Sequence, residues 1–173
     1  MAKNDFDGGF SDVHKEYYGG ESTYHKSTSG WGYISNDKTL LKAFGVDALE
    51  AWTQNSPGHP QGIWLFGLHD KKWYLITNYY MCQFPGLCGA CMLSNLAPSL
   101  TFEFTDKRHD ALIKAIVNVG YITGYTRLIT SETKATSFGA TETEAYERCG
   151  FKVIEEFTNK RTSHKIQILS KEL

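Results

Sequence analysis

The segment from residue 100 to residue 131 constrains the fold most, because it predicts a helix between two strands. Residues 100–104 alternate apolar and polar side chains, as a strand does, and residues 125–130 are predicted to form a second strand. Between them Asp106 can cap a helix with an apolar stripe at helical spacing: Leu112, Ala115, Ile116 and Val119. A helix that joins two strands makes a crossover, so the sequence predicts an α/β fold with a mixed sheet.

The other predicted elements surround this unit. Asp37 can cap a helix through Phe44, and Val46, Leu49 and Trp52 continue at helical spacing after a break at Gly45. The remaining elements are, in order, a hairpin of strands at 63–66 and 73–77, a short helix at 141–149 ended by Gly150, and a hairpin of strands at 151–158 and 164–169. The predicted order is therefore helix, hairpin, strand, helix, strand, helix, hairpin.

Residues 1–36 differ in composition from the rest of the chain. They hold six of the 16 glycines, together with Ser, Thr, Asp and spaced aromatic residues, and they keep no helical or strand period. Glycine-rich chain loses much backbone entropy when it becomes ordered. The sequence thus predicts an extended N-terminal arm over 1–36 and a single domain over 37–173. The arm is interpreted either as a flexible terminus or as a segment that binds other protein subunits through its aromatic side chains.

Length and charge exclude several function classes. The chain of 173 residues suits one domain, and its 18 basic against 19 acidic residues argue against a protein that wraps duplex nucleic acid, so no specific nucleic-acid partner is expected. No apolar run approaches the roughly 20 residues of a membrane span. The N-terminus lacks the apolar region of a secretion signal, so we expect a cytoplasmic protein, or a virion protein made in a host cytoplasm, and not a secreted one.

Four cysteines leave several interpretations open. Cys82, Cys88 and Cys91 fall within ten residues, and Cys149 lies far downstream. Three local thiolates and one distant thiolate could hold zinc, although the sequence has only one Cys-x-x-Cys pair and strong zinc signals have two. The alternatives are a redox pair at Cys88 and Cys91, a cysteine nucleophile with one of the six histidines, or small side chains in the core. No metal site is assigned.

The segment 145–153, Ala-Tyr-Glu-Arg-Cys-Gly-Phe-Lys-Val, resembles the short helix, glycine stop and aromatic strand start of the GNAT (Gcn5-related N-acetyltransferase) superfamily. By organisation the resemblance extends over residues 37–173, because 100–131 matches the central unit of that family and 63–77 matches its early strands. It implies one GNAT-like domain with a mixed, mostly antiparallel sheet flanked by helices. The segment 150–158, which includes Glu-Glu-Phe-Thr at 155–158, is also similar to the C-terminal end of small GNAT-like internal virion proteins of short-tailed phages.

The resemblance implies roles for particular residues. GNAT enzymes hold the pyrophosphate of acetyl-CoA on backbone N–H groups at the start of the central helix, which here corresponds to Lys107, Arg108, His109 and Ala111. Tyr146 matches the tyrosine that many members use as general acid toward the leaving thiolate, and Glu103 occupies the expected central strand as a candidate base. The helix start departs from the family pattern, because it has no glycine and carries the acidic residues Asp106 and Asp110.

Two functions follow from this comparison. In the first, the acyl-CoA site is degenerate, no cofactor is bound, and the protein is a structural or accessory component of an assembly such as a phage virion, with residues 1–36 contacting other subunits. In the second, the protein is an active acyl-CoA-dependent N-acyltransferase that binds acetyl-CoA and uses Tyr146 as general acid.

Overall fold

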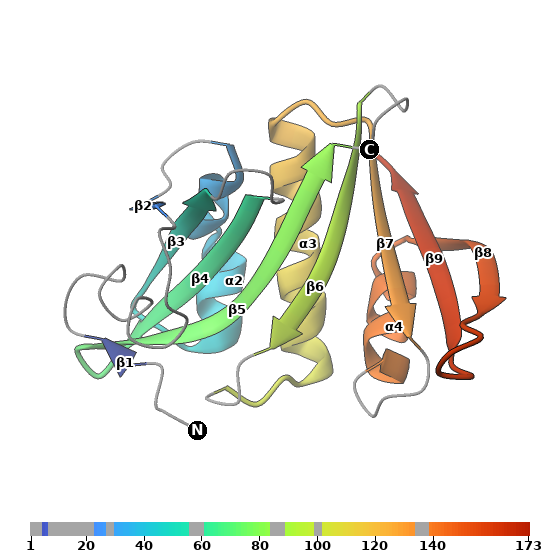
Figure 1. Cartoon of the computed structure of the whole chain (residues 1–173). Coiled ribbons are helices and arrows are strands. Elements are labelled where there is room, and N and C mark those ends of the chain that lie inside the picture. The colour runs from blue at the N-terminus through green and yellow to red at the C-terminus, as the bar shows by residue number, and fades with distance from the viewer. Residues whose placement is uncertain are drawn as a thin grey trace.

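A computed structural model of the chain describes residues 5–6, 23–26, 30–55, 61–83, 89–98, 102–133 and 139–173 (Figure 1). The helices are the 3-10 helix η1 (Gly30–Asn36), α2 (Lys38–Phe44), α3 (Asp106–Ile122) and α4 (Gly139–Arg148). The strands are β1 (Asp5–Phe6), β2 (Thr23–Lys26), β3 (Ala48–Asn55), β4 (Gln61–His69), β5 (Lys72–Gln83), β6 (Ala90–Pro98), β7 (Arg127–Thr133), β8 (Lys152–Thr158) and β9 (Lys165–Glu172).

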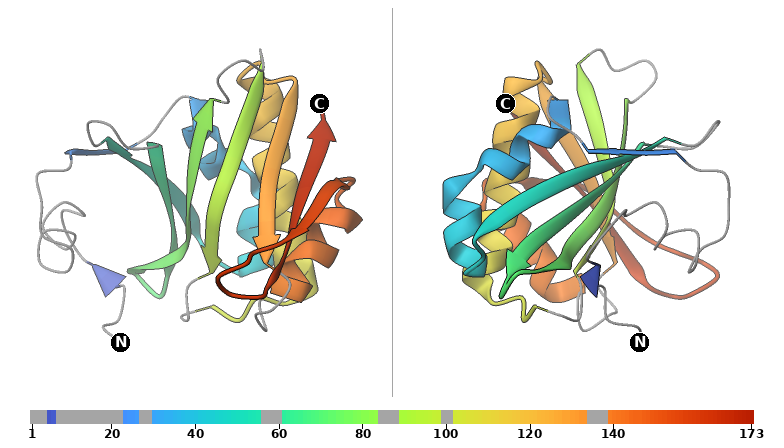
Figure 2. Two further views of the ribbon diagram at one scale, coloured as in Figure 1. Left: turned by 45° about the vertical axis from the view of Figure 1, so that its right-hand side comes forward. Right: turned by 90° about the vertical axis from the view of Figure 1, so that its left-hand side faces the viewer.

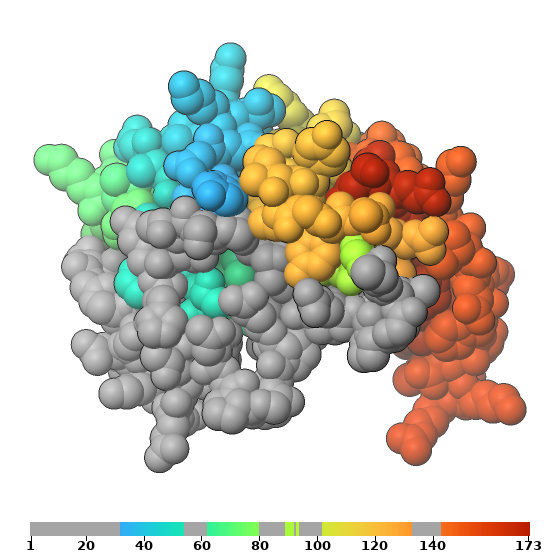
Figure 3. Space-filling model, turned by 90° about the horizontal axis from the view of Figure 1, so that it is seen from above, coloured from blue at the N-terminus to red at the C-terminus, as the bar shows by residue number. Residues whose placement is uncertain are grey.

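The strands form one mixed, mostly antiparallel sheet, as predicted. Its order is β2-β3-β4-β5-β6-β7-β9-β8, and β1 pairs with β5 beside this path. Among the described strands only β6 and β7 run parallel, because α3 makes the crossover between them. Helices α2, α3 and α4 lie together on one face of the curved sheet (Figure 2). The C-terminal segment after residue 143 forms one side of the molecule (Figure 3), where β8 is the edge strand of the sheet.

Helix α3 is the central helix that the sequence predicts. Its N-cap is Thr105, whose hydroxyl accepts a hydrogen bond from the backbone N–H of Arg108, so the predicted cap at Asp106 was wrong by one residue. The predicted apolar stripe is buried, with Leu112 and Ile116 almost completely covered. This stripe packs α3 on the sheet and forms the centre of the main hydrophobic core.

The prediction of helical structure after Gly45 was wrong. Gly45 adopts a left-handed conformation (φ 65°) that ends α2, and residues 48–55 then form β3, which pairs with β4. Leu49, Ala51 and Thr53 alternate along β3 and are all buried. A strand with a buried alternating face can also contain apolar residues three apart, which is why the spacing alone suggested a helix.

The strand predicted at residues 100–104 was wrong over 102–104, and residues 100 and 101 lie outside the described residues. Residues 102–105 are an irregular segment before α3, and the parallel partner of β7 is instead β6. Phe102 and Phe104 both pack edge-on against the ring of Phe44, with centroid distances of 5.7 and 5.3 Å. Phe102 and Phe104 are two positions apart because both contact Phe44, and not because they lie on one face of a strand.

The C-terminal elements agree with the sequence analysis. Gly150 follows α4 with φ 91°, and β8 and β9 form the final antiparallel hairpin. Toward the N-terminus, the packed part of the chain begins before the division expected at residue 37. Ile34 in η1 is completely buried in the main core, and β2 adds a strand to β3. Within the described residues, no helix is both long enough and apolar enough to span a bilayer.

Candidate cofactor site at the start of helix α3

The parallel strands β6 and β7 pair along only part of their length. Their ladder runs from Ala90 opposite Arg127 to Leu93 opposite Thr130. Beyond these residues β6 stays paired with β5, whereas β7 stays paired with β9, so the two strands diverge. Figure 1 shows them separating toward the end of the sheet at which α3 begins. Ligands of α/β proteins bind at such places, at the carboxyl ends of diverging strands, so this is the candidate site.

The first turn of α3 has the general properties of an anion site, because backbone N–H groups and the helix dipole favour negative charge there. Two of its amides are already bonded within the turn: the N–H of Arg108 donates to the hydroxyl of Thr105, and the N–H of His109 donates to the Thr105 carbonyl oxygen. Asp106 adds a carboxylate as the first helical residue, and one of its oxygens lies 3.6 Å from a guanidinium nitrogen of Arg148.

The side chain of Arg108 connects the start of α3 to α2. Its Nε donates a hydrogen bond to the carbonyl oxygen of Ala43 (3.1 Å), and its Nη1 donates to the carbonyl oxygen of Glu103 (2.8 Å). The guanidinium carbon also lies 5.4 Å from the centre of the Phe44 ring. The structure therefore places this predicted phosphate-binding residue in a contact between backbone segments.

His109 is a core residue. Only 3% of its surface is exposed, and its ring packs edge-on against Phe104 at a centroid distance of 5.0 Å. Neither ring nitrogen has a hydrogen-bond partner among the described residues. Burial lowers the pKa of the imidazole, the nearby charge of Arg148 lowers it further, and Asp106 and Asp110 act in the opposite direction. The ring is thus neutral near pH 7 and supplies no positive charge for a phosphate.

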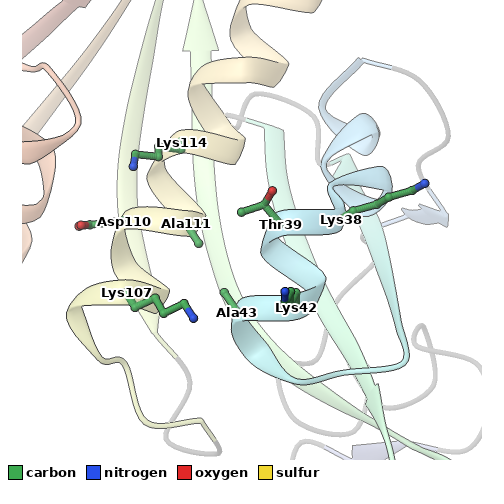
Figure 4. Close-up of a pocket in the computed structure, with 8 residues that line it drawn as sticks. All are labelled: Lys38, Thr39, Lys42, Ala43, Lys107, Asp110, Ala111 and Lys114. Carbon is green, nitrogen blue, oxygen red and sulfur yellow. The ribbon is translucent and has the colours of Figure 1, made fainter.

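The other two predicted cofactor residues face α2. Lys107 is exposed, Ala111 is buried, and both line a cavity of about 700 Å³ between α2 and α3 (Figure 4). The four predicted residues therefore point in different directions: Arg108 toward the end of α2, His109 into the core, and Lys107 and Ala111 into the cavity between the helices.

The two predicted catalytic residues lie in different surroundings. Glu103 is exposed in the irregular segment before α3, so its expected place on a central strand was wrong. Tyr146 belongs to the main core, is 1% exposed, and packs edge-on against Phe151 at a centroid distance of 5.0 Å. An acid and a base must reach the same substrate, so this placement gives no direct support for their acting as a pair.

A polar tie between α3 and α4 was not predicted from the sequence. Arg148 donates from Nη2 and Nε to the carboxylate of Asp110, over distances of 2.9 to 3.2 Å. The neighbouring Cys149 lies against the carbonyl oxygen of Asp110, with its sulfur at 3.8 Å, and burial raises the pKa of its thiol. Arg148 is 38 residues from Asp110, so nothing in the local pattern indicates the pair.

The structure describes two of the four cysteines in full. Cys91 and Cys149 are buried free thiols, whereas Cys88 and the side chain of Cys82 lie outside the described residues. No group of three or more His, Cys, Asp or Glu side chains suited to a metal ion occurs in the part of the chain that the structure describes. The zinc interpretation, which needs all four thiols, stays a prediction.

Comparison with solved structures shows the GNAT fold. A Desulfovibrio desulfuricans protein described as a GNAT-family acetyltransferase matches with a TM-score of 0.51 and 13% identity, over 88% of this chain and 99% of that chain. Nourseothricin acetyltransferase matches with a TM-score of 0.50 and 12% identity, over 87% of this chain and 98% of that chain. A GNAT-family acetyltransferase from Bacillus anthracis matches with a TM-score of 0.51 and 9% identity, over 64% of this chain and 65% of that chain. No protein-family model and no curated protein sequence matches the chain.

Proposed function

We propose that the chain is a GNAT-fold protein with a degenerate acyl-CoA site, which acts as a structural or accessory component of an assembly. The observation that carries this proposal is the placement of Arg108. At the helix start where the fold would hold a diphosphate, the guanidinium of Arg108 is bonded to the carbonyl oxygens of Ala43 and Glu103. The most suitable cation of this turn thus stabilises the contact between α2 and α3.

The cost of redirecting this side chain supports the proposal. A hydrogen bond from a charged donor contributes roughly 1.5–3 kcal/mol, and a phosphate at this turn would have to replace two of them. It would also approach the carboxylate of Asp106, and every residue of the turn carries a Cβ that keeps a ligand away from the amides. These features disfavour a diphosphate on the backbone of residues 106–109.

In this proposal the role of the protein comes from its contacts with other subunits. Residues 1–36, with their spaced aromatic side chains, are the segment proposed to make those contacts, and a virion is the kind of assembly suggested by the resemblance of the C-terminal segment. Both parts are open to the experiments below.

The divergence of β6 and β7 favours a second candidate function. A space between these strands beside the start of α3 is where a pantetheine arm would lie in an acyl-CoA-dependent N-acyltransferase. In this alternative Tyr146 would protonate the leaving thiolate of CoA, Lys107 would supply charge to the phosphates, and acetyl-CoA would be the cofactor.

Calorimetry with two matched ligands separates the two candidates. Acetyl-CoA and ATP both carry adenine, ribose and phosphates, but only acetyl-CoA has the pantetheine arm and the thioester. For a degenerate site we expect acetyl-CoA to bind no more tightly than ATP, and we expect no thiol release when the protein is incubated with acetyl-CoA and a panel of amines. An affinity for acetyl-CoA about tenfold or more above that for ATP, or steady thiol release, would instead establish the enzyme.

A truncation tests the proposed contacts. Removing residues 2–22 retains β2 and Ile34, which belong to the folded domain. When the tagged full chain is purified from the cells that make it naturally, we expect it to sediment as part of a particle much larger than its own 19.5 kDa. The truncated chain is expected to sediment as a free protein. If it stays in the same particle, residues 2–22 do not make the contacts.

A further inference from the structure

A groove between α2 and α3 collects positive charge from both helices. It is a cavity of about 700 Å³ with four lysines at its border, Lys38 and Lys42 from α2 and Lys107 and Lys114 from α3. Figure 4 shows Lys107 extending toward α2, whereas the ammonium groups of Lys38 and Lys114 lie at the two outer sides. These four residues are a large share of the 18 basic residues of a chain whose net charge is −1.

The charge of the groove is not neutralised within the described part of the chain. None of the four ammonium groups has an ion-pair partner among the described residues, and all four side chains are exposed. The single carboxylate in the lining belongs to Asp110, which is bonded to Arg148 at 2.9 Å. The ammonium groups of Lys38 and Lys114 point outward, whereas Lys42 and Lys107 carry charge at the centre of the groove, so an anion bound there gains most from these two lysines.

The shape of the groove suits a small molecule. Thr39, Ala43 and Ala111 contribute short side chains between the lysines, and the volume lies within the range of roughly 300–1,000 Å³ for small-molecule sites. No aromatic residue occurs among the described residues of its lining, so these residues offer nothing for a nucleobase to stack on. Lysine ammonium groups act as point charges without a fixed geometry, which fits a flexible chain of phosphoryl groups.

The groove shares Lys107 and Ala111 with the candidate acyl-CoA site, but it lies between α2 and α3 and not between the diverging strands. Its lining residues on α3, at positions 107, 110, 111 and 114, follow one side of the helix, whereas Leu112, Ile113 and Ile116 face the core. We propose that this groove binds a small anion built from a chain of phosphoryl groups, such as an inorganic polyphosphate or the triphosphate of a nucleotide. The inference does not depend on the proposed function, because it involves neither the diverging strands nor a thioester.

Titration calorimetry with tripolyphosphate and with ATP tests the proposal on the full chain. Lys42→Glu combined with Lys107→Glu reverses the charge at the centre of the groove, and we expect it to weaken tripolyphosphate binding by about tenfold or more. The matched control is Lys152→Glu with Lys160→Glu, which changes the net charge equally at exposed positions in and beside the C-terminal hairpin. We expect the control to bind nearly as the unmodified chain does. If the groove variant with two glutamates does not fold, Lys42→Gln combined with Lys107→Gln is used in its place, because it removes the two charges without reversing them.

A local measurement places the ligand. With alanine methyl groups labelled for NMR, tripolyphosphate is expected to shift the resonances of Ala43 and Ala111 and to leave unchanged the resonance of Ala145, a residue of α4 that belongs to the core. Equal affinity for tripolyphosphate and ATP would show that the phosphate chain alone determines binding, and tighter binding of ATP would identify a nucleotide as the ligand.

The proposal is wrong if neither ligand binds at about 1 mM, if the control weakens binding as much as the groove variant, or if a short single-stranded oligonucleotide binds more tightly than both. Tripolyphosphate has no pantetheine arm, so none of these outcomes decides whether acyl-CoA binds.

Discussion

At the scale of a single residue, Arg108 of α3 connects its own helix to α2 and to the irregular segment before α3. It bonds to the carbonyl oxygens of Ala43 and Glu103 and packs over the ring of Phe44. Arg108→Met keeps much of the side-chain volume but removes both hydrogen bonds, so we expect urea unfolding to show a loss of about 2 kcal/mol. Arg108→Lys should recover less than half of this loss, because one ammonium group cannot reproduce the two directed bonds.

The control for this prediction is Arg161→Met, in the turn between β8 and β9, where the side chain is exposed. It should change the free energy of unfolding by less than about 0.5 kcal/mol. If Arg108→Met were equally neutral and acetyl-CoA then bound more tightly, the guanidinium would not be a fixed structural group, and the argument for a degenerate site would be lost.

His109 gives the fold a dependence on pH. Burial, first, and then the charge of Arg148 lower its pKa, while Asp106 and Asp110 oppose the shift. The unfolded state therefore binds the proton more readily than the folded state, and the stability that the neutral ring provides is complete above the unfolded pKa and is lost as the pH falls through the folded pKa. We expect His109→Leu to reduce the loss of stability between about pH 7.5 and pH 5, measured by urea unfolding. His69→Leu, at an exposed position, should leave the slope as it is.

Residue types predicted the candidate site only in part. The sequence indicated the start of α3 and the four residues there, but it gave no signal that Arg108 bonds to Ala43, which is 65 positions away. The histidine and the tyrosine were suggested as site residues by their position along the chain. Their burial depends on which side of α3 and α4 faces the sheet, and side chains from distant strands determine this.

At the scale of elements, Arg148 of α4 forms ion pairs with two carboxylates of α3, Asp110 at 2.9 Å and Asp106 at 3.6 Å. Arg148 and Asp110 form several hydrogen bonds, and their side chains are 36% and 26% exposed. A double-mutant cycle of Arg148→Ala and Asp110→Ala should give a coupling free energy of about 0.5–1 kcal/mol, as is usual for partly exposed pairs with good geometry. Raising the salt concentration to about 1 M should reduce the coupling. A coupling near zero at low salt would show that the pair of Arg148 with Asp110 does not help to hold α4 on α3.

The elements that could be predicted have strong local signals. The stripe of α3, the glycine after α4 and the final hairpin depend on residues close in sequence. Within residues 37–173 two strands, β3 and β6, were missed for opposite reasons. In β3 a core-facing alternation was hidden by apolar residues at helical spacing, whereas β6 (ACMLSNLAP) contains no β-branched or aromatic residue, so its residue types favour no strand by themselves. Strand β6 is fixed by pairing with β5 and β7, which local sequence does not encode.

For the whole molecule, the N-terminal limit of the folded unit decides how the proposed arm can be studied. Composition divides the chain near residue 36, because the glycine-rich segment ends there. The core does not follow composition: Ile34 is completely buried in it, and β2 completes the sheet beside β3. A segment that is poor in apolar residues can thus contribute one essential core side chain, and a deletion placed by composition would remove it.

Two truncations measure this contribution. The chain that lacks residues 2–36 loses β2, η1 and Ile34, and loss of one fully buried aliphatic side chain alone costs about 2–5 kcal/mol. The chain that lacks residues 2–22 retains all three. Since domains are stable by only about 5–15 kcal/mol, we expect the longer deletion to unfold at a clearly lower urea concentration than the shorter one. Ile34→Ala in the full chain should reproduce about half or more of the difference between the two truncations. Equal midpoints would show that the domain begins after η1, and the deletion of residues 2–36 would then be the better test of the contacts between subunits.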